Sequence, residues 1–129
     1  MTRADILIVE DEFLISLNLE NLLNKFNYRV VGRSTSGKDA ILKAEQLKPD
    51  LILMDIMLEG EMDGIEAADI IKNRFNIPVI YLTAYSTDEV IKRAKLTEPF
   101  GYLLKPLDDK ELYITIETSL YKNKKHLIL

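Results

Sequence analysis

The stretch Leu51-Ile52-Leu53-Met54-Asp55 decides the fold. Four apolar residues in succession, with no polar residue between them, are typical of a strand that is buried on both faces of a parallel sheet. Such sheets occur in α/β domains, where helices cover both faces. The run ends on Asp55, and because an unpaired buried charge is costly, an acid at this place indicates a functional position.

Three other apolar runs also end on polar or charged residues. They are residues 6–9 before Glu10 and Asp11, residues 79–82 before Thr83, and residues 102–104 before Lys105. The carboxyl ends of parallel strands lie at one edge of a sheet, and the crevice there is where open α/β sheets bind ligands. The pattern therefore predicts one candidate catalytic site, which contains Glu10, Asp11, Asp55, Thr83 and Lys105.

Segments with helical periodicity separate the strands. The first predicts an amphipathic helix with one buried stripe, formed by Ile15, Leu19, Leu22, Leu23 and Phe26. Further strands are expected at residues 29–33, from Pro78 and from Gly101. Further helices are expected from residue 36 to the stop at Pro49, after Gly64, at a capping box formed by residues 86–89, and at a cap formed by residues 108–111.

This order of segments predicts five βα units. With right-handed crossovers, they give an α/β doubly wound three-layer sandwich around a five-stranded parallel sheet. The periodicity does not determine the strand order, and the flavodoxin-like order 2-1-3-4-5 of a (βα)5 fold is one of the common solutions. We expect a single domain over residues 1–129, with its core at 5–120 and a helix extension or tail at 121–129, because 129 residues suffice for one core only.

The composition excludes several classes of function. There are 17 basic and 21 acidic residues, a net charge of −4, and the one basic cluster is confined to residues 122–125, so direct nucleic-acid binding is not expected. The chain contains no cysteine, which fits a reducing cytoplasm. Its first apolar run is too short for a signal peptide or a membrane span. We therefore expect a cytoplasmic domain without membrane contact.

The predicted crevice has the groups needed for metal-assisted phosphoryl transfer. Three converging carboxylates repel one another unless a cation lies between them, and oxygen ligands without histidine or cysteine suit Mg²⁺. Asp55 is then a candidate nucleophile that forms an acyl phosphate. Lys105 supplies a positive charge and Thr83 a hydroxyl group for the phosphoryl oxygens.

Four motifs resemble those of one known family, the receiver domains of two-component response regulators. The motifs are Val9-Glu10-Asp11-Glu12, Met54-Asp55-Ile56-Met57 with the following Met62-Asp63-Gly64-Ile65-Glu66, Leu82-Thr83-Ala84, and Gly101-Tyr102-Leu103-Leu104-Lys105-Pro106. The resemblance extends from Ile6 to about Leu120. Each motif alone is weak evidence, and the set is specific.

The resemblance implies that this is a phosphoprotein in which Asp55 accepts a phosphoryl group from a phosphohistidine. It implies a Mg²⁺ site formed by Asp11, Asp55 and the backbone carbonyl of Met57, with Glu10 acting through water. Thr83 and Tyr102 resemble the switch pair, which changes the face made by the fourth helix, fifth strand and fifth helix. Lys105-Pro106 resembles a position where receivers hold a cis peptide.

The same resemblance implies the partners. These are a sensor histidine kinase or a histidine phosphotransfer protein, and a downstream effector protein that the sequence does not identify. A receiver catalyses its own phosphorylation and dephosphorylation and is not a conventional turnover enzyme. We expect a monomer or a phosphorylation-dependent homodimer.

Two details depart from the usual family pattern. The loop after Asp55 is one residue longer than usual and carries Glu59-Gly60-Glu61, which adds two acids beside the site. The acidic pair before the first helix is Glu-Asp where Asp-Asp is commoner, and the longer Glu10 can still hold a metal-bound water. Met57 and Tyr85 are expected to flank the site and to hinder a hydrolytic water.

Three other classes of protein are alternatives. A flavodoxin needs a phosphate-cradling loop after the first strand, and the acids at residues 10–12 would repel the phosphate of FMN. A phosphatase with a catalytic aspartate would need a second acid where Met57 stands. A phosphorylation-independent binding module of the receiver type is expected to lack one of the five site residues, and none is missing. This last class remains as the alternative.

Overall fold

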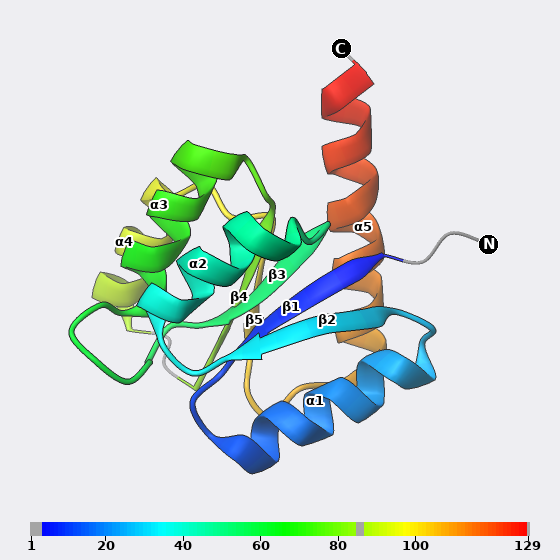
Figure 1. The fold of residues 1–129 in the computed structure, drawn as a ribbon, viewed down its shortest axis with the longest axis horizontal. Helices are drawn as coiled ribbons and strands as arrows, with labels where there is room; N and C mark the ends of the chain where they lie inside the picture. The colour runs from blue at the N-terminus through cyan, green and yellow to red at the C-terminus, as the bar shows by residue number, and fades with distance from the viewer. Residues whose placement is uncertain (1–3, 85–86, 129) are drawn as a thin grey trace.

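The computed structural model describes residues 4–84 and 87–128, and it describes side chains through residue 123. Strands and helices alternate along the described chain (Figure 1). The strands are β1 (Asp5–Val9), β2 (Arg29–Ser34), β3 (Leu51–Asp55), β4 (Val79–Thr83) and β5 (Gly101–Leu104). The helices are α1 (Phe13–Lys25), α2 (Gly37–Leu47), α3 (Gly64–Phe75), α4 (Asp88–Leu96) and α5 (Asp109–Ile128).

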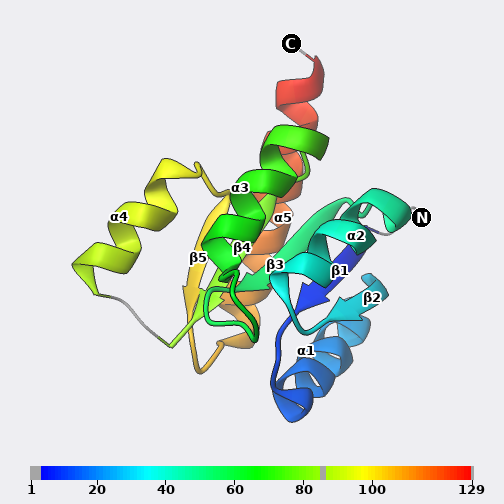
Figure 2. The ribbon, with the colours of Figure 1, turned by 60° about the vertical axis from the view of Figure 1, so that its left-hand side comes forward.

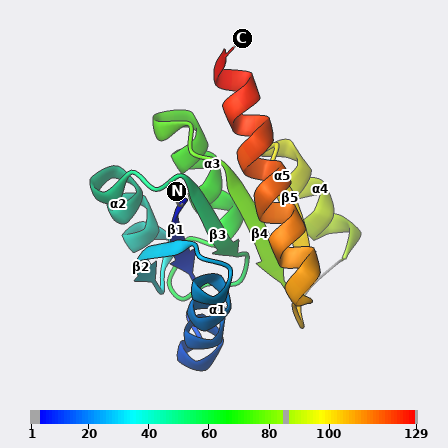
Figure 3. The same ribbon diagram turned by 90° about the vertical axis from the view of Figure 1, so that its right-hand side faces the viewer.

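All neighbouring strands pair in parallel, in the order β2-β1-β3-β4-β5. The sheet separates two apolar clusters. One contains buried residues of α2, α3 and α4, and the other contains buried residues of α1 and α5. Figures 2 and 3 show these two helical layers on opposite faces of the sheet. The predicted doubly wound, flavodoxin-like α/β fold with strand order 2-1-3-4-5 is confirmed.

The central strands are as deeply buried as their sequences predict. Every residue of β3 and of β4 is buried. In the register of the sheet, Val9 lies beside Met54, Asp55 beside Leu82, and Thr83 beside Leu104. The strands therefore end at one level, and the side chains that follow them are brought to a common edge.

The outer strand β2 is irregular. Ile6 pairs with Val30, but the next residue, Leu7, pairs with Gly32, so Val31 is an extra residue that forms a bulge. Lys43 of α2 donates a hydrogen bond to the backbone carbonyl of Arg33 in this strand. Among the described residues, no helix has both the length and the apolar character needed to cross a membrane.

Several element boundaries differ from the predicted ones. β4 begins at Val79, one residue after the expected start, and α4 begins at Asp88. The predicted capping box at residues 86–89 is wrong as a description of this helix, because the N-cap is Thr87, whose hydroxyl group accepts from the backbone N–H of Val90. Ser86 lies outside the described residues. Asp108 does accept a hydrogen bond from the N–H of Glu111, as predicted for the cap of the last helix.

The first turn of α3 lies directly against the backbone of Asp55. A Cβ atom added to Gly64 would lie 2.0 Å from the carbonyl oxygen of Asp55, closer than real Cβ contacts allow. The N–H of Gly64 also donates to the carbonyl of Ile56 at 2.8 Å. A glycine is therefore required here because the helix and the strand end approach so closely.

We expect Gly64→Ala to destabilise the fold by at least about 3 kcal/mol, because backbone atoms must move apart to admit the methyl group. The measurement is urea unfolding followed by circular dichroism. Gly60→Ala is the matched control: Gly60 has a φ of +90° but open space around it, so the loss there should be about 1 kcal/mol from backbone strain alone. Equal losses in the two variants would contradict this interpretation.

Candidate functional site

The five predicted side chains are placed around one crevice at the carboxyl edge of the sheet. Glu10 and Asp11 follow β1, Asp55 ends β3, Thr83 ends β4, and Lys105 follows β5. One carboxylate oxygen from each of Glu10, Asp11 and Asp55 lies within 4.8 Å of the others. The convergence expected from the sequence is therefore present in the structure.

Lys105 links two of the three acids. Its Nζ donates to Oε1 of Glu10 at 2.6 Å and to Oδ2 of Asp55 at 2.8 Å. Its backbone N–H donates to the carbonyl of Thr83, and the peptide bond to Pro106 is cis, as the resemblance implied. The ammonium group therefore compensates carboxylates that lie almost entirely out of contact with solvent.

Burial dominates the electrostatics of Glu10. It raises the pKa of the Glu10 carboxyl to about 7, against the opposing effect of the hydrogen bond from Lys105. For Lys105, burial alone lowers the pKa, but the hydrogen bonds and negative charges of Asp55 and Glu10 outweigh this effect and raise the pKa. The charged states of lysine and acids therefore depend on one another.

The donor set suits a hard divalent cation. When all three carboxylates are ionised, the single ammonium group of Lys105 leaves an excess of negative charge in the crevice. All the donor atoms are oxygens, which Mg²⁺ prefers. Backbone N–H groups orient the acids: the N–H of Met57 donates to Oδ1 of Asp55, and that of Glu12 donates to Oε2 of Glu10. The residues present therefore fit a Mg²⁺ ion.

Thr83 and Tyr102 lie on neighbouring strands and on one face of the sheet. Thr83 is completely buried, and Tyr102 is partly buried against the apolar cluster on the side of α2, α3 and α4. Tyr102 pairs in register with Tyr81, two residues before Thr83, and the two tyrosine rings meet edge to face with centroids 6.2 Å apart. The predicted switch residues are thus both directed toward the layer that contains α4.

The long loop after Asp55 is attached to the neighbouring loop. Glu59 forms an isolated parallel bridge with Ser36, just before α2. Glu59, Gly60 and Glu61 of this loop are all exposed. Met57 is also exposed and lies beside Asp55, whereas Tyr85, its predicted companion at the site, lies outside the described residues.

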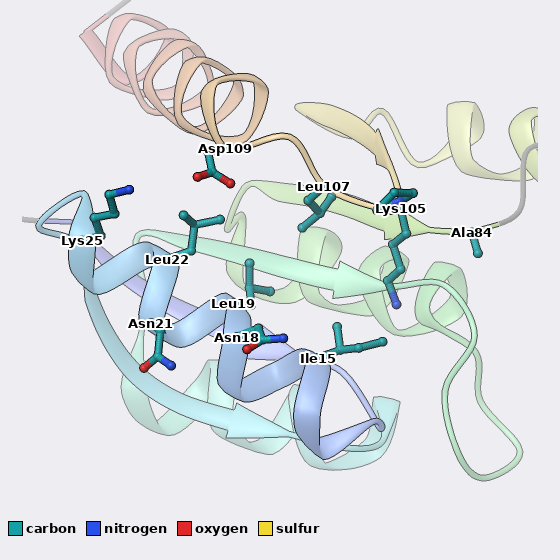
Figure 4. Close-up of a pocket in the computed structure, with 11 residues that line it drawn as sticks. Ile15, Asn18, Leu19, Asn21, Leu22, Lys25, Ala84, Lys105, Leu107 and Asp109 are labelled. Carbon is teal, nitrogen blue, oxygen red and sulfur yellow. The ribbon is translucent and has the colours of Figure 1, made fainter.

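Sequence reasoning missed a groove that opens beside Lys105. A cavity of about 800 Å³ lies between α1 and the segment that follows β5 (Figure 4). The prediction that Ile15, Leu22 and Phe26 belong to one buried stripe is wrong in part: Leu19 and Leu23 are buried, but these three are only partly covered. Ile15 and Leu22 line this groove, and helical periodicity alone does not distinguish the lining of a groove from a buried core.

Comparison with known proteins assigns the family. The response regulator receiver domain family matches residues 6–117. The transcriptional regulatory protein PdtaR of Mycobacterium tuberculosis is 36% identical over 115 residues, which is 89% of this chain and 56% of the relative. The response regulator VraR of Staphylococcus saprophyticus is 37% identical over 121 residues, which is 92% of this chain and 57% of the relative.

Solved structures agree with the family assignment. The signal receiver domain of a modulated diguanylate cyclase from Desulfovibrio desulfuricans G20 superposes with a TM-score of 0.92 at 38% identity, and the match covers 97% of this chain and 99% of that one. The chain therefore belongs to the response regulator receiver domains. It spans about half the length of the curated relatives it matches.

The raised pKa of Glu10 predicts a pH-dependent stability. The pKa in the folded protein, about 7, exceeds the ordinary value of 4.5, so protonation favours the folded state. The contribution of this group to the free energy of unfolding is present at low pH and is lost as the pH rises through 7. Without metal, Glu10→Gln should remove a loss of at most about 3 kcal/mol between acid and alkaline conditions.

The measurement is urea unfolding in EDTA at pH values below 5 and above 8. Glu12→Gln is the control, because it removes an exposed carboxylate close to the site in the sequence. Parallel pH profiles for wild type and Glu10→Gln would contradict a special role of burial at this position.

Proposed function

We propose that this receiver domain is a phosphoacceptor in a two-component system. Asp55 takes a phosphoryl group from a phosphohistidine on a sensor histidine kinase or a histidine phosphotransfer protein. The observation that carries the proposal is the position of Asp55: its side chain is only 7% exposed, its carboxylate accepts from Lys105 at 2.8 Å, and it clusters with two further acids at the carboxyl edge of the sheet.

The transfer itself forms an oxygen–phosphorus bond and breaks a phosphorus–nitrogen bond. A carboxylate oxygen of Asp55 attacks phosphorus, and the imidazole of the donor leaves with the bonding electron pair and takes up a proton. Lys105 then turns its ammonium group from the free carboxylate to a phosphoryl oxygen, and the Thr83 hydroxyl group donates to another. Ala84 follows Thr83 and is exposed, so its small side chain leaves space for the donor.

We further propose that Asp11, Asp55 and the backbone carbonyl of Met57 hold Mg²⁺, with Glu10 acting through a bound water. When bound, the ion offsets negative charge on the transferring oxygens. The excess of carboxylates over ammonium groups in the crevice and its all-oxygen donor set support this assignment. The proposal places the domain in the cytoplasm, where ATP-dependent kinases form phosphohistidine.

The phosphoryl group acts as a switch by adding charge and acceptor oxygens. Thr83 engages them and Tyr102 turns inward, so that the face made by α4, β5 and α5 changes its packing. An effector protein that distinguishes the two arrangements would read the signal, and self-association through this face is one way to do so.

We propose that the donor protein docks over the groove beside Lys105. A partner that delivers phosphohistidine to Asp55 must cover the surface next to the crevice, and the groove is the apolar part of that surface. The groove is lined by Ile15, Asn18, Leu19, Asn21, Leu22, Lys25, Ala84, Lys105, Pro106, Leu107 and Asp109.

The phosphoacceptor proposal is tested by intact mass after incubation with acetyl phosphate. Wild type with Mg²⁺ should gain the mass of one phosphoryl group, and Asp55→Asn should gain none because the nucleophile is absent. Omitting Mg²⁺ should abolish most of the gain. No gain by folded wild type in the presence of Mg²⁺ would favour the alternative, a phosphorylation-independent protein-binding module.

Thr83→Ala tests the switch. We expect this variant to gain the phosphoryl group, because Asp55 and Lys105 remain, but to lose the link to Tyr102. The measurement is amide hydrogen exchange in residues 101–104 with and without beryllofluoride, a phosphoryl analogue. Wild type and Thr83→Ser should both respond, since both carry a hydroxyl group. A full response in Thr83→Ala would remove Thr83 from the switch.

A further inference from the structure

Helix α4 is held to the molecule by few apolar contacts. Of its nine residues, only Ala94 is buried, and Val90 is partly buried against the neighbouring apolar cluster. Leu96 is 83% exposed. Figure 2 shows α4 at the margin of the molecule, on the opposite side from β2. With so little packing, the polar contacts of α4 have a large share in setting its position.

One of these contacts reaches the loop that follows Asp55. Nη2 of Arg93 lies 2.8 Å from Oδ2 of Asp63, and the two side chains are 43% and 27% exposed. At the end of α4, the Thr97 hydroxyl group donates to the carbonyl of Ala94, so the hydroxyl group of Tyr81 is the donor in the 2.6 Å bond between Tyr81 and Thr97. The helix is thus attached at its end to β4 and by Arg93 to Asp63.

Asp63 is itself fixed relative to Asp55. Its Oδ1 accepts from the N–H of Glu66, and its own N–H donates to the Glu66 side chain, which completes a capping box on α3. The next residue, Gly64, lies in direct contact with the backbone of Asp55. A displacement of the Asp55 backbone therefore displaces Gly64 and Asp63, because close-packed groups have no room to absorb it.

We propose that Arg93 is a positioning residue, whose ion pair with Asp63 couples α4 to the phosphoacceptor loop. This connection runs from Asp55 through Gly64 and Asp63 to α4, and it is separate from the pair Thr83 and Tyr102. It rests on the proposed function for its purpose: the ion pair favours the position that α4 has without a phosphoryl group, and its loss makes the phosphorylated arrangement easier to reach.

The expected effect of the ion pair on the position of α4 is small, as a conformational switch requires. A partly exposed ion pair changes a local equilibrium by about two- to fivefold. Conformational switches keep a minor state at low population, so a factor of this size shifts the balance without locking it. The contact is one hydrogen bond from Nη2 of a planar guanidinium group, whose fixed donor direction the ammonium group of a lysine does not reproduce.

Amide hydrogen exchange without any phosphoryl analogue tests the coupling directly. Arg93→Gln removes the cation, and Asp63→Asn removes the negative charge but keeps a capping oxygen for α3. Each variant should speed exchange in α4 about two- to fivefold. Arg93→Gln should also speed exchange in residues 57–63, far from the substitution in the sequence. The double variant should exceed neither single variant, because both remove the same contact.

Two further variants separate coupling from a local effect on the helix. Lys95→Gln removes another exposed cation of α4, one that forms no ion pair among the residues described, and it should leave both segments unchanged. Arg93→Lys should restore part of the protection. Unchanged exchange in the single variants, an effect of Arg93→Gln confined to α4, or additive effects in the double variant would each overturn the proposal.

Beryllofluoride binding in the presence of Mg²⁺ tests whether the ion pair favours the arrangement without a phosphoryl group. Arg93→Gln should bind about two- to fivefold more tightly than wild type, and Lys95→Gln should match wild type. Equal or weaker binding by Arg93→Gln would overturn the proposal that the ion pair favours the arrangement without a phosphoryl group. If wild type binds no beryllofluoride, the proposed phosphoacceptor function fails, while the exchange experiment still decides whether Arg93 couples the two segments.

Discussion

The structure depends on the compensation of buried negative charge by one lysine. Glu10 and Asp55 are both withdrawn from solvent, and two carboxylates at such a place are tolerated only because Lys105 lies between them. The same lysine is aligned through the backbone bond between its N–H and the Thr83 carbonyl, so the last two strands support the charge balance of the first and third. A phosphoryl group or a cation that enters the crevice necessarily changes this balance.

The regular sheet also fixes the positions of the side chains in the crevice. The parallel register brings the ends of the central strands to one level, and the close contact at Gly64 fixes α3 against the end of β3. Asp55 therefore has a rigid backbone on one side and an exposed loop, which includes Gly60, on the other. The proposed function uses both properties, since a nucleophile must be held still while its partner approaches.

The sequence predicted the strands and the site because both follow from local patterns. The apolar run that ends at Asp55 indicates a buried strand. Lys105 was predicted to lie near the acids because it follows another apolar run, as they do. Strand order came from resemblance and common topology, since no periodicity encodes it.

The cap of α4 was misplaced by one residue because Ser86 and Thr87 are both suitable caps. The Arg93–Asp63 pair was missed because a contact across 30 residues leaves no local pattern. The groove was missed because exposure depends on the distance between α1 and the segment after β5.

The irregular outer strand has a consequence for the behaviour of the protein at high concentration. An open sheet presents two free edges, and a straight, unprotected edge can pair with that of another molecule and begin aggregation. The bulge at Val31 interrupts the straight row of hydrogen-bonding groups, and Lys43 occupies the carbonyl of Arg33 that faces outward. At the other edge, β5 has only four residues and is followed by Pro106. The sheet is thus open in topology yet poorly suited to growing by the addition of strands.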